Sequence, residues 1–143
     1  MTVSMGSGAS AIKYQGTAES RMTVGGRFLQ VEYQAQGKAD ATEGMFTAGF
    51  DSRHQRHTLI AMDSFGTYFV TSQGQRDAKS GKIRMSGTDD DPVMKALGHT
   101  KEFVHVLDLR GPEEFVMEVW FVDTRTAARK DFKYMDYTFK RKK

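Results

Sequence analysis

The chain has 143 residues, no cysteine and a formal net charge of +3. This length fits a single domain, 1–143, with a core of its own, and the lack of cysteine excludes disulfides, thiol catalysis and thiolate metal sites. The basic tail at 140–143 is enough to supply the whole charge excess, and acidic residues at 89–91 interrupt any basic stripe. This distribution of charge argues against nucleic-acid binding.

The start of the sequence shows no basic segment followed by an apolar run, and no apolar stretch is long enough to span a bilayer. We therefore expect no signal peptide and no membrane association. Together with the lack of cysteine, this favours a cytoplasmic protein.

Short strands separated by turns run along most of the chain. The first hairpin is predicted at 17–35, because Gly25 and Gly26 tolerate the positive φ that a tight turn requires. One short helix is predicted at 91–98, where Asp91 is a suitable N-cap and Pro92 fits the first turn. Further strands are predicted at 42–50, 55–62, 67–75, 82–87, 100–109, 114–122 and 132–140.

The predicted fold class is all-β. About nine to ten antiparallel strands with short connections form a meander, and a sheet of this size has to close or double over to remove its exposed edges. An up-and-down β-barrel with at most one short helix is the simplest solution. Side-chain alternation then assigns one face of each strand to the barrel interior.

The strand at 114–122 is apolar on both faces. One face carries Phe115, Met117, Val119 and Phe121, and the other carries Val116, Glu118, Trp120 and Val122. Either the outer face packs on a second subunit, which predicts a homodimer, or a cavity side mixes apolar and polar groups. Glu118 is either a polar anchor in a ligand pocket or an exterior residue, because a carboxylate among apolar neighbours has to be paired, protonated or solvated.

Two further residues are candidates for a pocket. Asp63 ends a predicted strand and is either an acid at the pocket mouth or a turn residue that satisfies backbone amides. His105 shares its strand face with apolar residues. His54 and His57 have no acidic third ligand at a motif spacing, and no nucleophile elbow or phosphate-binding loop is present. The sequence therefore predicts no metal site, no cofactor and no catalytic residue.

Several short segments have the order and spacing of segments in a known family. They are 25–29, 49–51, 62–67, Glu118 with Trp120, and the ending 137–143. From about residue 3 to residue 143, the sequence resembles the bacterial family called domain of unknown function 1579. The resemblance implies a small lipocalin-like or fatty-acid-binding-like barrel whose interior holds one small ligand. It also implies that Arg27, Asp63, Glu118 and Trp120 are pocket residues.

Members of that family open with a short helix and a Gly-x-Trp segment, whereas the single tryptophan here is Trp120. We therefore expect residues 1–5 to start inside the first strand, so that this closing strand is shortened. A dimer partner is one way to cover the resulting gap.

The leading hypothesis is a binding protein that holds a mostly apolar small molecule with a polar end. The predicted ligand-binding residues are Arg27, Asp63, His105, Glu118 and Trp120, and the segment 92–97 is a candidate lid. One alternative is a barrel-shaped enzyme in which a buried acid or histidine transfers a proton, with His105 and Glu118 paired on neighbouring strands. Another is a ligand-free dimeric interaction protein.

Overall fold

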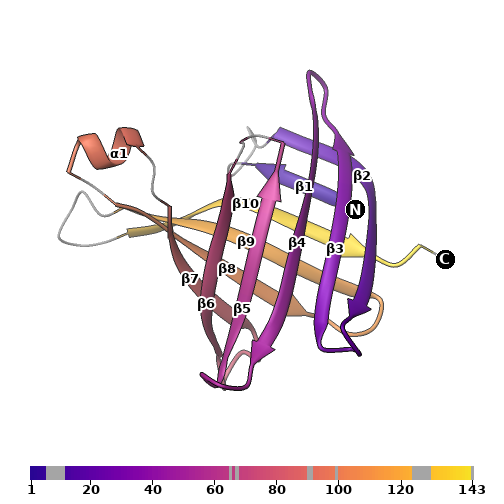
Figure 1. The fold of residues 1–143 in the computed structure, drawn as a ribbon. Helices are drawn as coiled ribbons and strands as arrows, with labels where there is room; N and C mark the ends of the chain where they lie inside the picture. Colours follow the sequence, from indigo (N-terminus) through magenta and orange to yellow (C-terminus); the bar gives the residue numbers. More distant parts are fainter. Residues whose placement is uncertain are drawn as a thin grey trace.

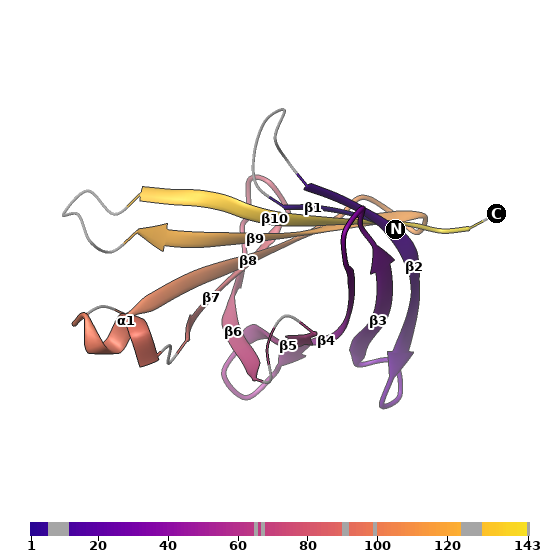
Figure 2. The same ribbon diagram turned by 90° about the horizontal axis from the view of Figure 1, so that it is seen from above.

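The structure is a computed structural model that describes residues 1–5, 12–64, 66, 68–89, 92–98, 100–123 and 130–142. Its strands form a closed antiparallel barrel, seen from two directions in Figures 1 and 2. The strands are β1 (Thr2–Met5), β2 (Ile12–Thr23), β3 (Phe28–Gln36), β4 (Ala41–Asp51), β5 (Arg56–Asp63), β6 (Phe69–Arg76), β7 (Ile83–Asp89), β8 (Lys101–Leu109), β9 (Glu114–Asp123) and β10 (Lys130–Lys140). A short helix, α1 (Pro92–Ala96), joins β7 to β8. The predicted all-β, up-and-down barrel with at most one short helix is confirmed.

The barrel has two different ends because successive strands run in opposite directions. From β2 onward each strand pairs with the next one along the chain, and β1 closes the barrel by pairing with both β2 and β10. The hairpins β2–β3, β4–β5, β6–β7 and β8–β9 turn at one end, which we call the packed end. The other end, called the open end, carries the β3–β4 connection, and α1 stands there outside the barrel wall (Figures 1 and 2).

The predicted β2–β3 hairpin is present, but its turn is longer than a two-residue Gly-Gly turn. The loop spans residues 24–27, because Thr23 pairs with Phe28. Its first three residues have positive φ values of 50°, 66° and 80°, a conformation that the two glycines adopt without steric cost. Arg27 therefore lies in a turn at the packed end rather than on a strand.

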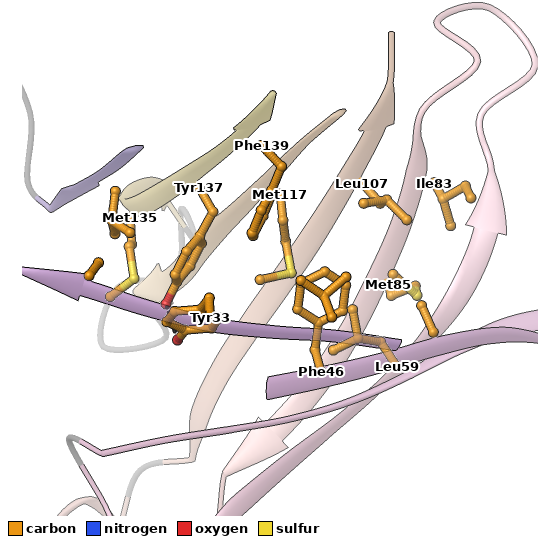
Figure 3. Close-up of a cluster of buried hydrophobic side chains, with 14 of the residues drawn as sticks. Tyr33, Phe46, Leu59, Ile83, Met85, Leu107, Met117, Met135, Tyr137 and Phe139 are labelled. Atoms are coloured by element: carbon orange, nitrogen blue, oxygen red, sulfur yellow. Dashed lines mark hydrogen bonds between the residues drawn. The ribbon is translucent and has the colours of Figure 1, made fainter. Parts of the chain in front are cut away.

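Inward-facing side chains fill the packed end of the barrel. Phe139 stacks on Phe115 with ring centroids 4.5 Å apart and meets Phe46 edge-on at 6.0 Å. Leu59 and Met85 are fully buried, and Figure 3 shows both close to Phe46. Burial of this apolar surface is the main contribution to the stability of the fold.

Strand β8 is buried on both faces, from residue 103 to residue 107. Its outward-facing Val104 and Val106 are only 3% and 6% exposed. An ion pair between Arg84 of β7 and Asp131 of β10, with an N–O distance of 2.6 Å, crosses the outer face of β8 and β9. The outward valines are thus covered within one chain. Apolar residues on both faces do not by themselves require a second subunit here, and the homodimer stays a prediction.

Gly87 of β7 provides a test of the interior packing. A methyl group at this position would collide with the carbonyl oxygen of Thr71 and the ring of Phe103. We expect Gly87→Ala to destabilise the fold by about 1–3 kcal/mol, because packed neighbours resist added volume. Ser86→Ala, at the exposed neighbouring position, is the matched control and should change stability by less than about 0.5 kcal/mol. Urea unfolding measures the stability of both variants, and equal unfolding midpoints for the two would contradict this packing.

Candidate functional site

A cavity of about 170 Å³ lies inside the barrel at its open end. An apolar cavity of about 150 Å³ is large enough to hold benzene, so this space accommodates a molecule of about one ring. Its apolar lining consists of Met45, Phe46, Ala61, Met62, Val70, Phe103, Met117, Val119, Phe121 and Met135. Its polar and charged lining consists of Tyr33, Asp63, Tyr68, Asp89, Lys101, His105, Tyr134 and Tyr137.

Two tyrosine hydroxyls meet on the cavity wall. The hydroxyl oxygens of Tyr33 on β3 and Tyr137 on β10 are 3.3 Å apart, and Figure 3 shows the two hydroxyl ends directed toward one another. Burial raises the pKa of Tyr33 to about 12 and that of Tyr137 well above its ordinary value, and the negative charge of Asp63 adds to both rises. Both phenols therefore stay protonated near neutral pH and act as hydrogen-bond donors.

The imidazole of His105 is 3% exposed and lines the same cavity. Its Nδ1 lies 2.9 Å from Oγ of Ser72 on β6. Burial lowers the pKa of His105 to about 4, so the ring is neutral at pH 7. Among the described residues only Ser72 hydrogen-bonds the ring, which leaves Nε2 available to a molecule in the cavity.

Charged residues surround the cavity mouth. Asp89 and Lys101 face one another on β7 and β8, with 3.2 Å between the carboxylate oxygen and the ammonium nitrogen. The same ammonium lies 5.3 Å from the ring centroid of Phe121, within the range of a cation–π interaction. Asp63 at the end of β5 adds a second carboxylate to the lining. The described cavity lining therefore contains two carboxylates and one ammonium group.

An open groove of about 910 Å³ adjoins the cavity. The groove and the cavity share Tyr33, Met45, Met62, Asp63 and Tyr68. The groove is also lined by Glu19, Glu32 and Glu43, and by no lysine, arginine or histidine among the described residues. Arg21 pairs with Glu32 at 2.9 Å from outside the lining. The groove is thus acidic, although the chain as a whole is basic. The strand register places its three glutamates on the outer face of the barrel, on the other side of the sheet from Tyr33 and Asp63.

The sequence matches the model of the family described as "Protein of unknown function (DUF1579)" over residues 1–141. The chain belongs to this family. No curated protein and no solved structure matches the chain. Membership of the DUF1579 family, predicted above from short segments, is confirmed, whereas a lipocalin-like relationship and a bacterial source stay predictions.

The structure places the five predicted ligand-binding residues of this DUF1579 protein in three different regions. Asp63 and His105 line the cavity. Glu118 and Trp120 lie on the outer face of β9, where the indole Nε1 donates a hydrogen bond to Oε2 of Glu118 at 2.8 Å. Arg27 is exposed in the β2–β3 turn at the packed end. Of the two alternatives for Glu118, the structure shows the exterior one, and it places His105 and Glu118 on opposite faces of the sheet.

Sequence reasoning did not find the tyrosine pair, the serine beside His105 or the ion pair at the mouth. Alternation puts Tyr33 and Tyr137 among apolar neighbours, but no spacing relates two residues that are 104 positions apart. Asp89 and Lys101 flank the predicted helix, and this position at the two ends of one connection is a sequence feature from which the pair could have been predicted.

Within the described ranges, no group of three histidine, aspartate or glutamate side chains is arranged to hold a metal ion. The one helix of these ranges, α1, is not long and apolar enough to cross a membrane.

The buried, neutral state of His105 predicts that the DUF1579 protein loses stability in mild acid. The pKa is 6.5 for an ordinary histidine and about 4 in the folded protein, so between these values the unfolded state binds more protons and is favoured. We expect this residue alone to lower the free energy of unfolding by about 2 kcal/mol from pH 7 to pH 5. Urea unfolding of the wild type and of His105→Gln at both pH values isolates the effect.

An NMR titration of the His105 ring in the folded wild type is a second readout, which does not depend on how the variant folds. The ring should stay neutral at pH 5, where exposed histidines are protonated. A ring that titrates near pH 6.5 would contradict the prediction.

Proposed function

We propose that this protein binds a small molecule with an apolar body and a polar end in the cavity at the open end of the barrel. The observation that carries the proposal is the composition of the cavity wall, in which an apolar surface surrounds a few converging polar groups. Pockets of this kind are typical of small-molecule sites. The volume of about 170 Å³ limits the buried part of the ligand to about one ring.

The polar groups define how such a ligand would lie. Phe46, Met117 and Val119 offer an apolar surface to its body. The hydroxyls of Tyr33 and Tyr137 and the imidazole of His105 are protein groups with which a hydroxyl, carbonyl or amine could hydrogen-bond. Because each of these groups has one hydrogen-bond partner among the described residues, a bound polar atom would add to these hydrogen bonds rather than replace them.

Binding is favoured over proton-transfer catalysis by the state of His105. A general base works best when its pKa lies near the operating pH. Burial holds the pKa of His105 at about 4, which makes the ring a weak base at neutral pH. A hydrogen-bonding role suits this residue better than a catalytic one.

We further propose that the protein is a homodimer and that it is cytoplasmic. The dimer has one supporting observation: Ile60, Met62 and Phe69 are large apolar residues exposed on the outer face of neighbouring strands β5 and β6. Native mass spectrometry tests it, because a monomeric mass across a wide range of concentration would contradict it. The location is supported by the absence of cysteine from the sequence.

Filling the cavity tests the binding proposal. Val119→Phe adds a ring to the cavity wall, whereas Val122→Phe, on the outer face of the same strand, is the matched control. Benzyl alcohol is the probe, and binding is followed through the methionine methyl NMR signals, which include those of Met117 and Met135 in the wall. We expect saturable shifts in the wild type and in the control, and their loss in Val119→Phe.

Native mass spectrometry of the purified protein gives a second readout, since extra mass that leaves on denaturation would identify a retained ligand. Binding of benzyl alcohol that survives Val119→Phe would place the site elsewhere and contradict the proposal. Absence of both retained mass and probe binding would contradict it as well.

A further inference from the structure

The charges around the cavity have a sign opposite to that of the chain. Two carboxylates line the cavity, on Asp63 and Asp89. The described lining has a single cationic side chain, that of Lys101, which is paired with one of these carboxylates. The chain as a whole has a net charge of +3. An excess of one sign of charge in a cleft raises the local concentration of ligands of the opposite sign.

Aromatic rings supply a second, independent feature. The cavity wall contains Tyr33, Tyr68, Phe103, Phe121, Tyr134 and Tyr137. The faces of such rings attract cations, and several rings around one space are the usual means of holding an organic ammonium group. A cation already occupies one ring face at the mouth, since the Lys101 ammonium lies 5.3 Å from the Phe121 centroid.

We propose that the ligand is a small organic cation, with an ammonium group at the mouth beside Asp63 and an apolar body of about one ring inside the barrel. This inference rests on the proposed function and names the chemical class of its ligand. The apolar body lies against Phe46 and Met117, deeper than the carboxylates. The ammonium group meets ring faces and a carboxylate.

A carboxylate ligand fits this site poorly. Its charge would come close to Asp63 and Asp89, and like charges at short range in a partly buried site oppose one another strongly. The Lys101 ammonium would have to leave Asp89 in order to pair with the ligand. His105 offers no positive charge, because its buried ring is neutral, and for the same reason it does not repel a cation.

The test compares three probes of equal size and different charge: benzylamine, benzyl alcohol and benzoate. Each is titrated into the wild-type protein at pH 7 and low salt, and binding is followed through the methionine methyl NMR signals. We expect benzylamine to bind at least about fivefold more tightly than benzyl alcohol, and benzoate to bind most weakly. The preference for benzylamine should shrink as salt is added, because salt screens the attraction.

Asp63→Asn removes the carboxylate at the mouth. The matched control is Asp136→Asn, because Asp136 lies on the outside of β10, where it pairs with Lys133. The first variant should bring benzylamine close to the affinity of benzyl alcohol, whereas the second should leave the preference intact. The salt series on the wild type keeps the test decisive even if Asp63→Asn does not fold.

The outcomes separate the two proposals. If benzyl alcohol or benzoate binds as tightly as benzylamine, the cation inference is wrong while the binding function stands. If benzylamine is preferred equally by Asp63→Asn and by the wild type, the cation does not lie at the mouth and the inference is also wrong. If no probe binds and Val119→Phe behaves as the wild type, the binding function itself fails, and the inference fails with it.

Discussion

Closure of the sheet by β1 is the constraint on which the rest of the structure depends. Because β1 pairs with both β2 and β10, the two ends of the meander meet and every strand gains two neighbours. Alternate side chains of all ten strands then face one shared interior. The contact between Tyr33 and Tyr137 exists because of this closure: β3 and β10 lie far apart in the meander, and closure brings them to the same side of the interior. Without it the cavity wall would have no tyrosine pair.

The interior is filled unevenly, and this unevenness produces the cavity. At the packed end, the ring of Phe139 contacts the rings of both Phe46 and Phe115. Toward the open end the inward positions include small residues such as Ala61 and Gly87, which bring little or no side-chain volume. The same barrel circumference therefore encloses a packed core at one end and a space of about 170 Å³ at the other. Gly87 has a further role, since its lack of a side chain leaves room for the Phe103 ring.

The sequence predicts the architecture well because the relevant patterns are local. Alternation, turn residues and the Gly25-Gly26 pair need only a few neighbouring positions, and the barrel follows from the number of strands and their need for closure. The site depends on register, which local patterns do not determine. Glu118 shows the difference: alternation allowed it to face either side, and pairing with Val106 on β8 places it outside. Local patterns also do not determine at which end of the barrel a turn lies. Arg27 lies in a turn at the packed end, opposite to the end that holds Asp63.

The placement of polar groups inside the barrel argues that the open end serves a ligand. Burying hydroxyl and imidazole groups costs stability unless each finds partners, and a packed apolar interior would avoid that cost. The interior nevertheless holds two pairs of polar groups. The hydroxyl oxygens of Tyr33 and Tyr137 are 3.3 Å apart, and Oγ of Ser72 lies 2.9 Å from Nδ1 of His105. Each pair satisfies part of its hydrogen-bonding capacity: two hydroxyls share one bond, and the imidazole uses one of its two nitrogens toward described residues. Three of the four groups line the cavity itself rather than the packed end, so their remaining capacity is directed to whatever fills that space.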